Sequence, residues 1–183
     1  LNVACEKGDL AVVEKLLAVD GIQVNQTDNG GFTPLYVACE NDHSKVVEKL
    51  LAVNGIGVNQ ASNNGWAPLN VACEKGAWTV VEKLLAVDGI QVNQANNNGF
   101  TPLNSACEKG HSKVVKMLLT VDDIQVNQVN QANNGGFTPL NIACKKGHSK
   151  VVKMLLAVDG IEVNQATNKG WTPLNGACQN GHS

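Results

Sequence analysis

Large aromatic side chains are scarce in this chain of 183 residues. Phe, Trp and Tyr make up 4% of the residues, whereas hydrophobic residues make up 43%, so we expect a core of small and branched side chains. Arginine is absent, since all 14 basic residues are lysine, and the net charge is −2 at pH 7. Without guanidinium groups for bidentate contacts or a positive overall charge, nucleic acid is not expected as a partner.

A long hydrophobic run is also missing. No stretch of 18 apolar residues is present for a membrane span, and the first residues, LNVACEKGDL, lack the basic and then apolar pattern of a signal peptide. The chain begins with Leu1 rather than Met, so this expectation concerns these residues only. We expect a soluble, intracellular protein of the cytoplasm, without a membrane partner.

What the chain does have is an internal repeat. Consecutive cysteines lie 34, 34, 34, 37 and 34 residues apart, and the five prolines follow the same period: Cys5, Cys39, Cys73, Cys107, Cys144 and Cys178; Pro34, Pro68, Pro102, Pro139 and Pro173. Equivalent cysteines of stacked helices would be about 8–10 Å apart, beyond the reach of a disulfide. We therefore expect buried, reduced thiols.

One copy of the repeat, residues 100 to 128, shows the local structure. Thr101 and Pro102 predict the start of a short helix that ends before Gly110, and Ser112 predicts the start of a second helix that ends near Val121. The polar and apolar residues after this second helix alternate and predict an exposed, hairpin-like finger. Because a unit of helix, turn, helix and finger cannot bury its own apolar face, neighbouring units must stack into a solenoid.

The repeated stretches TPLYVACENDHSKVVEKLL, APLNVACEKGAWTVVEKLL, TPLNSACEKGHSKVVKMLL and TPLNIACKKGHSKVVKMLL resemble the ankyrin repeat. The resemblance covers the whole chain and implies an all-α, ankyrin-type solenoid of helix-turn-helix units joined by hairpin-like fingers. It departs from the family in a unit one residue longer, in Cys at the second Ala position, and at the His position. The residues at the His position are Tyr36, Asn70, Asn104, Asn141 and Asn175. The buried hydrogen bond that the family makes there must be remade by another group or lost.

We expect a single array over residues 1–183, of about five and a half units. The units are 1–31 (partial), 32–65, 66–99, 100–136 with a three-residue insertion, 137–170, and 171–183 (partial). The first unit lacks its opening Thr-Pro, its helix stretch VVEKLLAV matches the interior copies, and the last unit stops where a second helix should begin. We interpret these features as a piece of a longer array with uncapped ends. The alternative is end-to-end stacking of chains through those ends.

Catalytic and metal-binding patterns are weak. A C-x-x-x-H spacing recurs, for example at Cys107 and His111, and on one continuous helix it would place both side chains on one face for zinc. Glycine interrupts most of these pairs, and Ala77 replaces the His once. Six equivalent thiols in apolar settings would also be unreactive. We expect no enzyme, no metal and no cofactor.

The family resemblance implies that the concave face, made of finger tips and first helices, binds another protein whose identity the residues do not give. Carried over by position, the candidate residues are Phe32, Trp66, Asn97, Asn98, Phe100, Ser105, Glu108, Lys109, Phe137, Lys169 and Trp171. The aromatic members either form a binding ladder or each pack on their own finger. The alternative function is a structural spacer or end-to-end filament unit with no specific ligand.

Two irregularities run against the uniform pattern. Residues 1–107 contain six lysines and 11 acidic residues, net −5, whereas residues 108–183 contain eight lysines and five acidic residues, net +3. This gradient either orients a partner or reflects drift on a solvated surface.

The segment VNQVNQ at 126–131 repeats itself, and we expect its extra residues, Val129, Asn130 and Gln131, to make a longer or bulged finger.

Overall fold

A computed structural model describes residues 1–121 and 126–181, and among them the secondary structure is entirely helical. The helices are α1 (Asn2–Lys7), α2 (Leu10–Leu17), α3 (Pro34–Glu40), α4 (Ser44–Leu51), α5 (Pro68–Lys75), α6 (Trp78–Leu85), α7 (Pro102–Lys109), α8 (Ser112–Leu119), α9 (Val126–Val129), α10 (Pro139–Lys146), α11 (Ser149–Leu156) and α12 (Pro173–Gln179).

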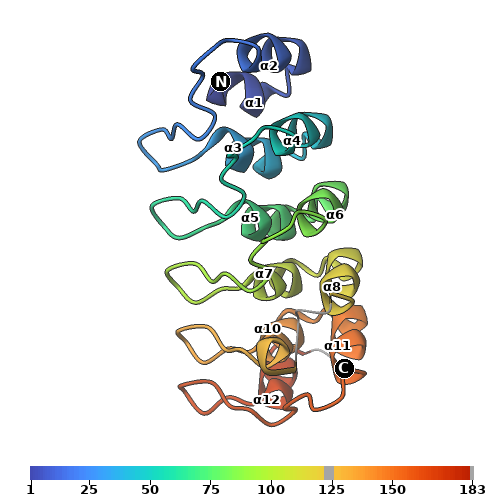
Figure 1. Cartoon of the computed structure of the whole chain (residues 1–183). Helices are drawn as coiled ribbons and strands as arrows, with labels where there is room; N and C mark the ends of the chain where they lie inside the picture. Colours follow the sequence, from blue (N-terminus) through green and yellow to red (C-terminus); the bar gives the residue numbers. More distant parts are fainter. Residues whose placement is uncertain (122–125, 182–183) are drawn as a thin grey trace.

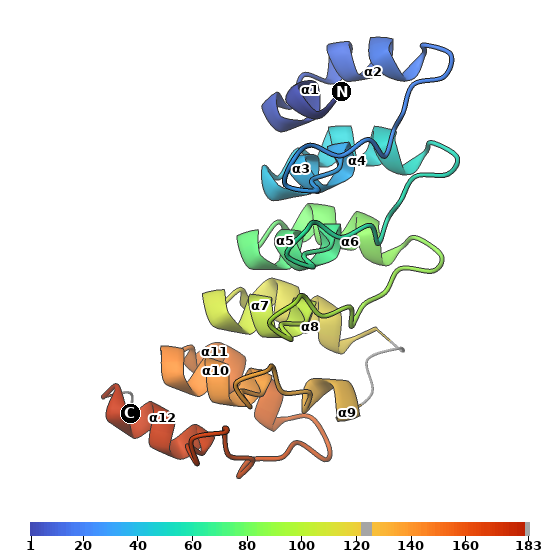
Figure 2. The same cartoon turned by 90° about the vertical axis from the view of Figure 1, so that its left-hand side faces the viewer.

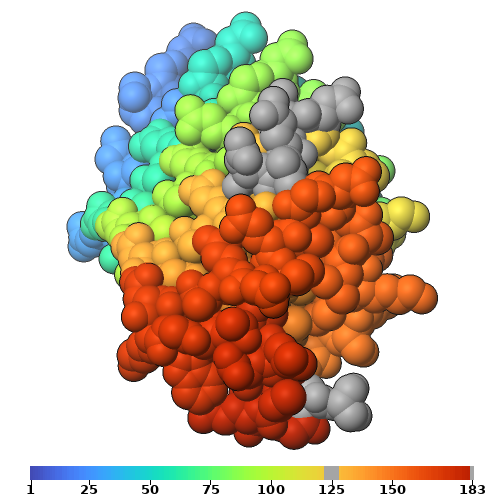
Figure 3. All heavy atoms as spheres, turned by 90° about the horizontal axis from the view of Figure 1, so that it is seen from below, coloured from blue at the N-terminus to red at the C-terminus, as the bar shows by residue number. Residues whose placement is uncertain are grey.

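The helices stack in two columns (Figure 1). The inner helices are α1, α3, α5, α7, α10 and α12, and the outer helices are α2, α4, α6, α8 and α11. Loops that we call fingers project from the row on the side of the inner helices, and Figure 2 shows the links that lead from each outer helix to the next finger. Seen along the row, successive units are offset from one another (Figure 3). The predicted all-α solenoid is confirmed.

The inner helices begin and end as their sequences predict. Thr101 accepts a hydrogen bond from the backbone N–H of Asn104, and Pro102 occupies the first turn, where its missing N–H leaves no donor unpaired. Gly110 ends the helix with φ of 75°, a left-handed conformation that glycine adopts without a steric penalty. Each inner helix is therefore held to about two turns by its own residues.

The core is a set of columns running along the row. Eight leucines and four valines are its largest fully buried side chains, led by Leu35, Leu50, Leu69, Leu84, Leu103, Leu118, Leu140 and Leu155. Cys5, Cys39, Cys73 and Cys107 form a parallel column of buried free thiols. Small and branched side chains thus fill the space between helices, as the shortage of aromatic residues predicts.

An asparagine amide remakes the buried hydrogen bonds expected at the family's His position. The Asn70 Nδ2 donates to the backbone oxygens of Gln94 at 3.0 Å and Phe100 at 3.2 Å, and the Asn70 Oδ1 accepts from the N–H of Ala67. Asn141 makes the equivalent bonds to Gln165 and, at 3.5 Å, to Trp171. One buried amide thereby ties an inner helix to both ends of the following finger.

The recurrent histidines link neighbouring units. The His43 Nε2 donates to the backbone oxygen of Glu6 at 2.9 Å, and His111 and His148 donate in the same way to Glu74 and Glu108. Because these oxygens lie in the last turn of the preceding inner helix, each ring caps that helix across the unit boundary. The C-x-x-x-H spacing therefore positions a structural histidine, as the interrupting glycines indicate.

The glycine beneath each ring is part of the same contact. A side-chain carbon at Gly76 would lie 2.6 Å from the His111 ring, and Gly8 and Gly110 are equally close to His43 and His148. Where the histidine is replaced by Ala77, the glycine position of the preceding unit holds Asp42, at φ of 56°. The two positions vary together because the ring and a side chain beneath it cannot both fit.

The VNQVNQ repeat does not lengthen the tip of its finger. Val126–Val129 form the short helix α9 on the link before the finger (Figure 2), and Val129 is buried. The finger tip after this helix keeps its usual length, because Asn133 bonds to Phe137 just as Asn96 bonds to Phe100. The burial of Val129 fixes the register of the link that leads into this finger tip. Asp123, which replaces a glycine here, lies outside the described residues.

The unit that precedes the inserted link contains a buried amide nitrogen without a hydrogen-bond partner. The Nδ2 of Asn104 is buried and has no hydrogen-bond partner, although the Asn104 Oδ1 still accepts from Thr101. In Asn70 and Asn141 the same nitrogen donates across to the following finger. The junction between α7 and α10 therefore lacks bonds that stabilise the regular junctions.

Candidate interaction surface

The finger tips are residues 27–32, 61–66, 95–100, 132–137 and 166–171, and a ladder of asparagines joins them. Asn97 donates from its backbone N–H to the oxygen of Asn64 and from its Nδ2 to the oxygen of Asn63. Asn63, Asn134 and Asn168 repeat both bonds along the row. The tips are therefore fixed relative to one another, unlike independent loops.

A second set of asparagines fixes the links. The Asn25 Nδ2 donates to the oxygen of Gly55 at 2.8 Å, and its Oδ1 accepts from the N–H of Gly57 at 2.8 Å. Asn59 and Asn130 repeat this pair of bonds with the next link. Asn130 is thus the structural counterpart of Asn25 in the inserted copy.

We call the surface between the finger tips and the inner helices the inner face. Five candidate aromatic residues lie at the bases of the tips: Phe32, Trp66, Phe100, Phe137 and Trp171. The first four are half-buried and Trp171 is exposed. The Phe32 ring lies against Gly30 of its own finger and stacks on Tyr36 with 4.6 Å between the centroids. The rings are therefore supported from within the row while one side stays open.

Ser105 does not belong to the inner face in this structure. Its side chain is buried, and its hydroxyl donates to the backbone oxygen of Thr101 at 3.1 Å. The preceding unit covers this position, because the equivalent Val3 of the first unit is 62% exposed and a side-chain carbon at the equivalent Gly176 of the last unit would meet Lys145 of the unit before it. Asn98 is exposed, and the tip residue Asn97 is exposed but uses its amide in the finger ladder.

Ion pairs cross the unit boundaries in two series. On the inner helices Lys75 pairs with Glu40, Lys109 with Glu74 and Lys146 with Glu108, so the candidates Glu108 and Lys109 already have partners. On the outer helices Lys49 pairs with Glu14 and Lys83 with Glu48. These contacts lower the pKa of the Glu48 carboxyl through the hydrogen bond from Lys83, and raise the pKa of Lys49 through its bond to Glu14.

Both series stop in the second half of the row. Met117 and Met154 stand where Lys49 and Lys83 stand earlier, and Lys116 and Lys153 replace the glutamates. On the inner helices Lys145 replaces glutamate. The lone aromatic residue Trp78 is 41% exposed, and the Nζ of Lys113 lies over its ring.

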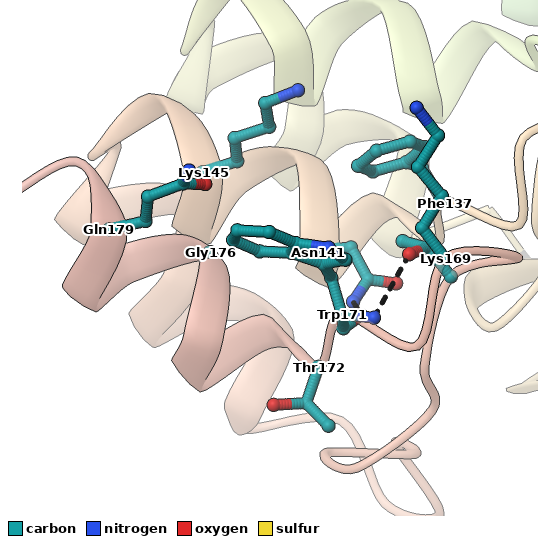
Figure 4. Close-up of a pocket in the computed structure, with 9 residues that line it drawn as sticks. Phe137, Asn141, Lys145, Lys169, Trp171, Thr172, Gly176 and Gln179 are labelled. Carbon is teal, nitrogen blue, oxygen red and sulfur yellow. Dashed lines mark hydrogen bonds between the residues drawn. The ribbon is translucent and has the colours of Figure 1, made fainter.

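Two adjoining cavities open on the inner face. One of about 400 Å³ lies between the tips at Phe100 and Phe137, and one of about 350 Å³ lies between the tips at Phe137 and Trp171. Lys145 borders both cavities. Figure 4 shows the second one, with Phe137 and Trp171 from neighbouring fingers and Lys145 and Gln179 from neighbouring inner helices.

The four buried cysteines are poor nucleophiles, whereas Cys144 is half-buried and Cys178 is exposed. Burial raises the pKa of the Cys39, Cys73 and Cys107 thiols well above the ordinary value, and that of Cys5 to about 11. Since the thiolate is the reactive form, these thiols are unreactive at neutral pH. Within residues 1–121 and 126–181, no three His, Cys, Asp or Glu side chains gather as metal ligands. No helix in the same ranges is long and apolar enough to cross a membrane.

Comparison with known proteins identifies the repeat. A model of the ankyrin repeat family (three copies) matches residues 1–96, 52–130 and 124–183. A protein of Escherichia coli (strain K12) named "Putative ankyrin repeat protein YahD" is 57% identical over 35 residues, which is 19% of this chain and 17% of that protein's length. Proteins of this family are generally modules of protein–protein interaction. With the stacked helix pairs and fingers described above, these matches show that the chain belongs to the ankyrin repeat family.

Proposed function

We propose that the inner face binds a segment of another protein. The observation that carries this proposal is the pair of adjoining cavities, which are lined by the half-open rings of Phe100, Phe137 and Trp171. Aromatic side chains in partly enclosed cavities are typical anchors of protein interfaces. Because hydrogen bonds already fix the fingers, little conformational entropy is lost when a segment lies across them.

A pull-down comparison tests the proposal. The tagged array carrying Phe100→Ala, Phe137→Ala and Trp171→Ala should recover much less of any specific partner than the unchanged array. The matched control is Trp78→Ala, which removes an exposed aromatic side chain from an outer helix. Circular dichroism should confirm that all forms stay helical. Equal recovery by the triple variant and the unchanged array would contradict binding through the inner face.

A second candidate function is end-to-end association of chains. Apart from Trp78 and Trp171, the exposed large hydrophobic residues described in the structure lie towards the two ends: Val3, Val12 and Val19 in one group, and Leu156, Val163 and Leu174 in the other. Apolar patches of this kind favour contact with another surface. Size-exclusion chromatography of residues 1–183 should then show a mass that rises with concentration, and a constant monomer mass would contradict this candidate.

A further inference from the structure

Three departures from the repeat meet at one cavity. Lys145 stands where the earlier units have glutamate, and Lys169 stands where the other finger tips have Asn or Gly. Gly176 stands where the other units have Val, Ser or Ile. All three line the 350 Å³ cavity between Phe137 and Trp171 (Figure 4). In a row of nearly identical units, this coincidence makes one cavity different from the rest.

Gly176 leaves space that a side chain fills elsewhere. The equivalent residues Val71 and Ile142 are 1% and 5% exposed, so their side chains pack beneath the neighbouring unit. A side-chain carbon at Gly176 would lie 3.5 Å from the Cβ of Lys145, an ordinary contact, and the backbone there is not left-handed. Valine would therefore fit, and the glycine is not required by backbone geometry.

The charges around this cavity have one sign. Its lining contains Lys145 and Lys169 and no carboxylate. The next residue of α10, Lys146, is paired with Glu108, but no described ion pair involves Lys145, whose Nζ lies 4.9 Å from the centroid of the Phe137 ring. An apolar hollow beside two ammonium groups complements an apolar side chain with carboxylates next to it.

We propose that this cavity takes one aromatic or large aliphatic side chain from an acidic segment of a partner protein. The neighbouring carboxylates of that segment pair with Lys145 and Lys169, and Phe137 and Trp171 enclose the anchor. The inference rests on the proposed function of the inner face and names the chemistry of the partner. The first half of the row does not offer this combination, because glutamates occupy the position of Lys145 there.

Fluorescence polarisation with synthetic peptides tests the proposal. The probe is a fluorescein-labelled peptide with one central Phe between two Asp-Glu dipeptides. One control peptide has Ala in place of Phe, and another has Lys in place of the acidic residues. We expect binding of the acidic Phe peptide to be at least about tenfold tighter than binding of either control. Absent or equal binding of the three peptides would overturn the proposal.

Variants locate the binding. Gly176→Val should fill the hollow and weaken the acidic Phe peptide about tenfold, and Lys145→Glu and Lys169→Glu should each weaken it by a similar factor. Lys150→Glu is the matched control, since it makes the same change of charge at an exposed residue of α11 and should have little effect. If Gly176→Val and Lys145→Glu bind the peptide as tightly as the unchanged chain, the cavity is not the site.

The two proposals fail in different ways. A partner recovered by the unchanged array, lost with the triple aromatic variant and retained by Gly176→Val and Lys145→Glu would preserve the inner face as a binding surface. That result would overturn the acidic anchor in this cavity. A partner retained by the triple aromatic variant would instead contradict the proposed function itself, whatever the peptides show.

Discussion

The first three helix pairs and the helices from α7 onward are built from almost the same unit, but they treat charge differently. In the first region lysines of one unit pair with glutamates of the unit before, on both helix columns. In the second region the outer series is absent and the inner series ends at Lys146. Paired charges contribute modestly to cohesion, whereas unpaired lysines beside a cavity remain available to a ligand. The departures from the repeat therefore mark the region where we propose that a partner binds.

Alkaline pH should lower the stability of the row through its column of buried cysteines. An unfolded thiol has a pKa of about 8.5, and burial raises the pKa of Cys39, Cys73 and Cys107 above it. Their contribution to stability is therefore complete below about pH 8.5 and is lost as pH rises, by about 1.4 kcal/mol per thiol and pH unit.

Thermal unfolding from pH 8 to 10.5 measures this loss. The melting temperature should fall more steeply for the unchanged chain than for the triple variant Cys39→Ala, Cys73→Ala and Cys107→Ala. The control variant is Cys178→Ala, which replaces an exposed cysteine outside the buried column. Equal slopes for the unchanged chain and the triple variant would show that the column does not set the alkaline limit.

Core truncation should distinguish the middle of the row from its end. Leu84 and Leu118 are fully buried, so changing either one to Ala should cost about 2–5 kcal/mol through lost packing and a residual cavity. Leu156 is 50% exposed and should cost clearly less when changed to Ala. Urea unfolding gives the free energies, and a Leu156→Ala variant as unstable as Leu84→Ala would contradict the assigned packing.

Loss of the Asn104 side chain, at the junction between α7 and α10, should destabilise the row less than loss of the equivalent Asn70 side chain at a regular junction. Asn70→Ala removes two bonds from Nδ2 to the following finger, whereas Asn104→Ala removes a nitrogen that already has no partner. We expect Asn70→Ala to be more destabilising than Asn104→Ala by about 1–2 kcal/mol. Urea unfolding of both variants provides the comparison, and equal losses would show that the Asn104 nitrogen is bonded in solution.

The histidine and glycine pair can be restored at the one interior boundary that lacks both. Ala77→His alone should destabilise the row, because the ring would meet the side chain of Asp42, as the close approach of Gly8 to His43 indicates. Together with Asp42→Gly it should gain the interunit hydrogen bond made by His43. The double-mutant cycle should give a favourable coupling of about 1 kcal/mol, and strict additivity would exclude the steric explanation.

Much of the fold follows from local sequence. The period of 34 residues, the Thr-Pro starts and the glycine ends predict the stacked helix pairs, because each signal acts within one or two turns of helix. The candidate aromatic residues also lie on the inner face as expected. Ser105 was misplaced because its burial depends on the unit that packs over it, which no local pattern records.

The sequence by itself determined the type of unit, the order of its helices and the sign of charge in each half, because these depend on residues close together in the chain. Only the tertiary structure decided that Val126–Val129 form a helix on the link and that Val129 is buried there, because the burial depends on contacts with other units. It also decided which lysines are paired and that Lys145, Lys169 and Gly176 line one cavity. Those relations join residues that lie in different units, and stacking alone brings them together.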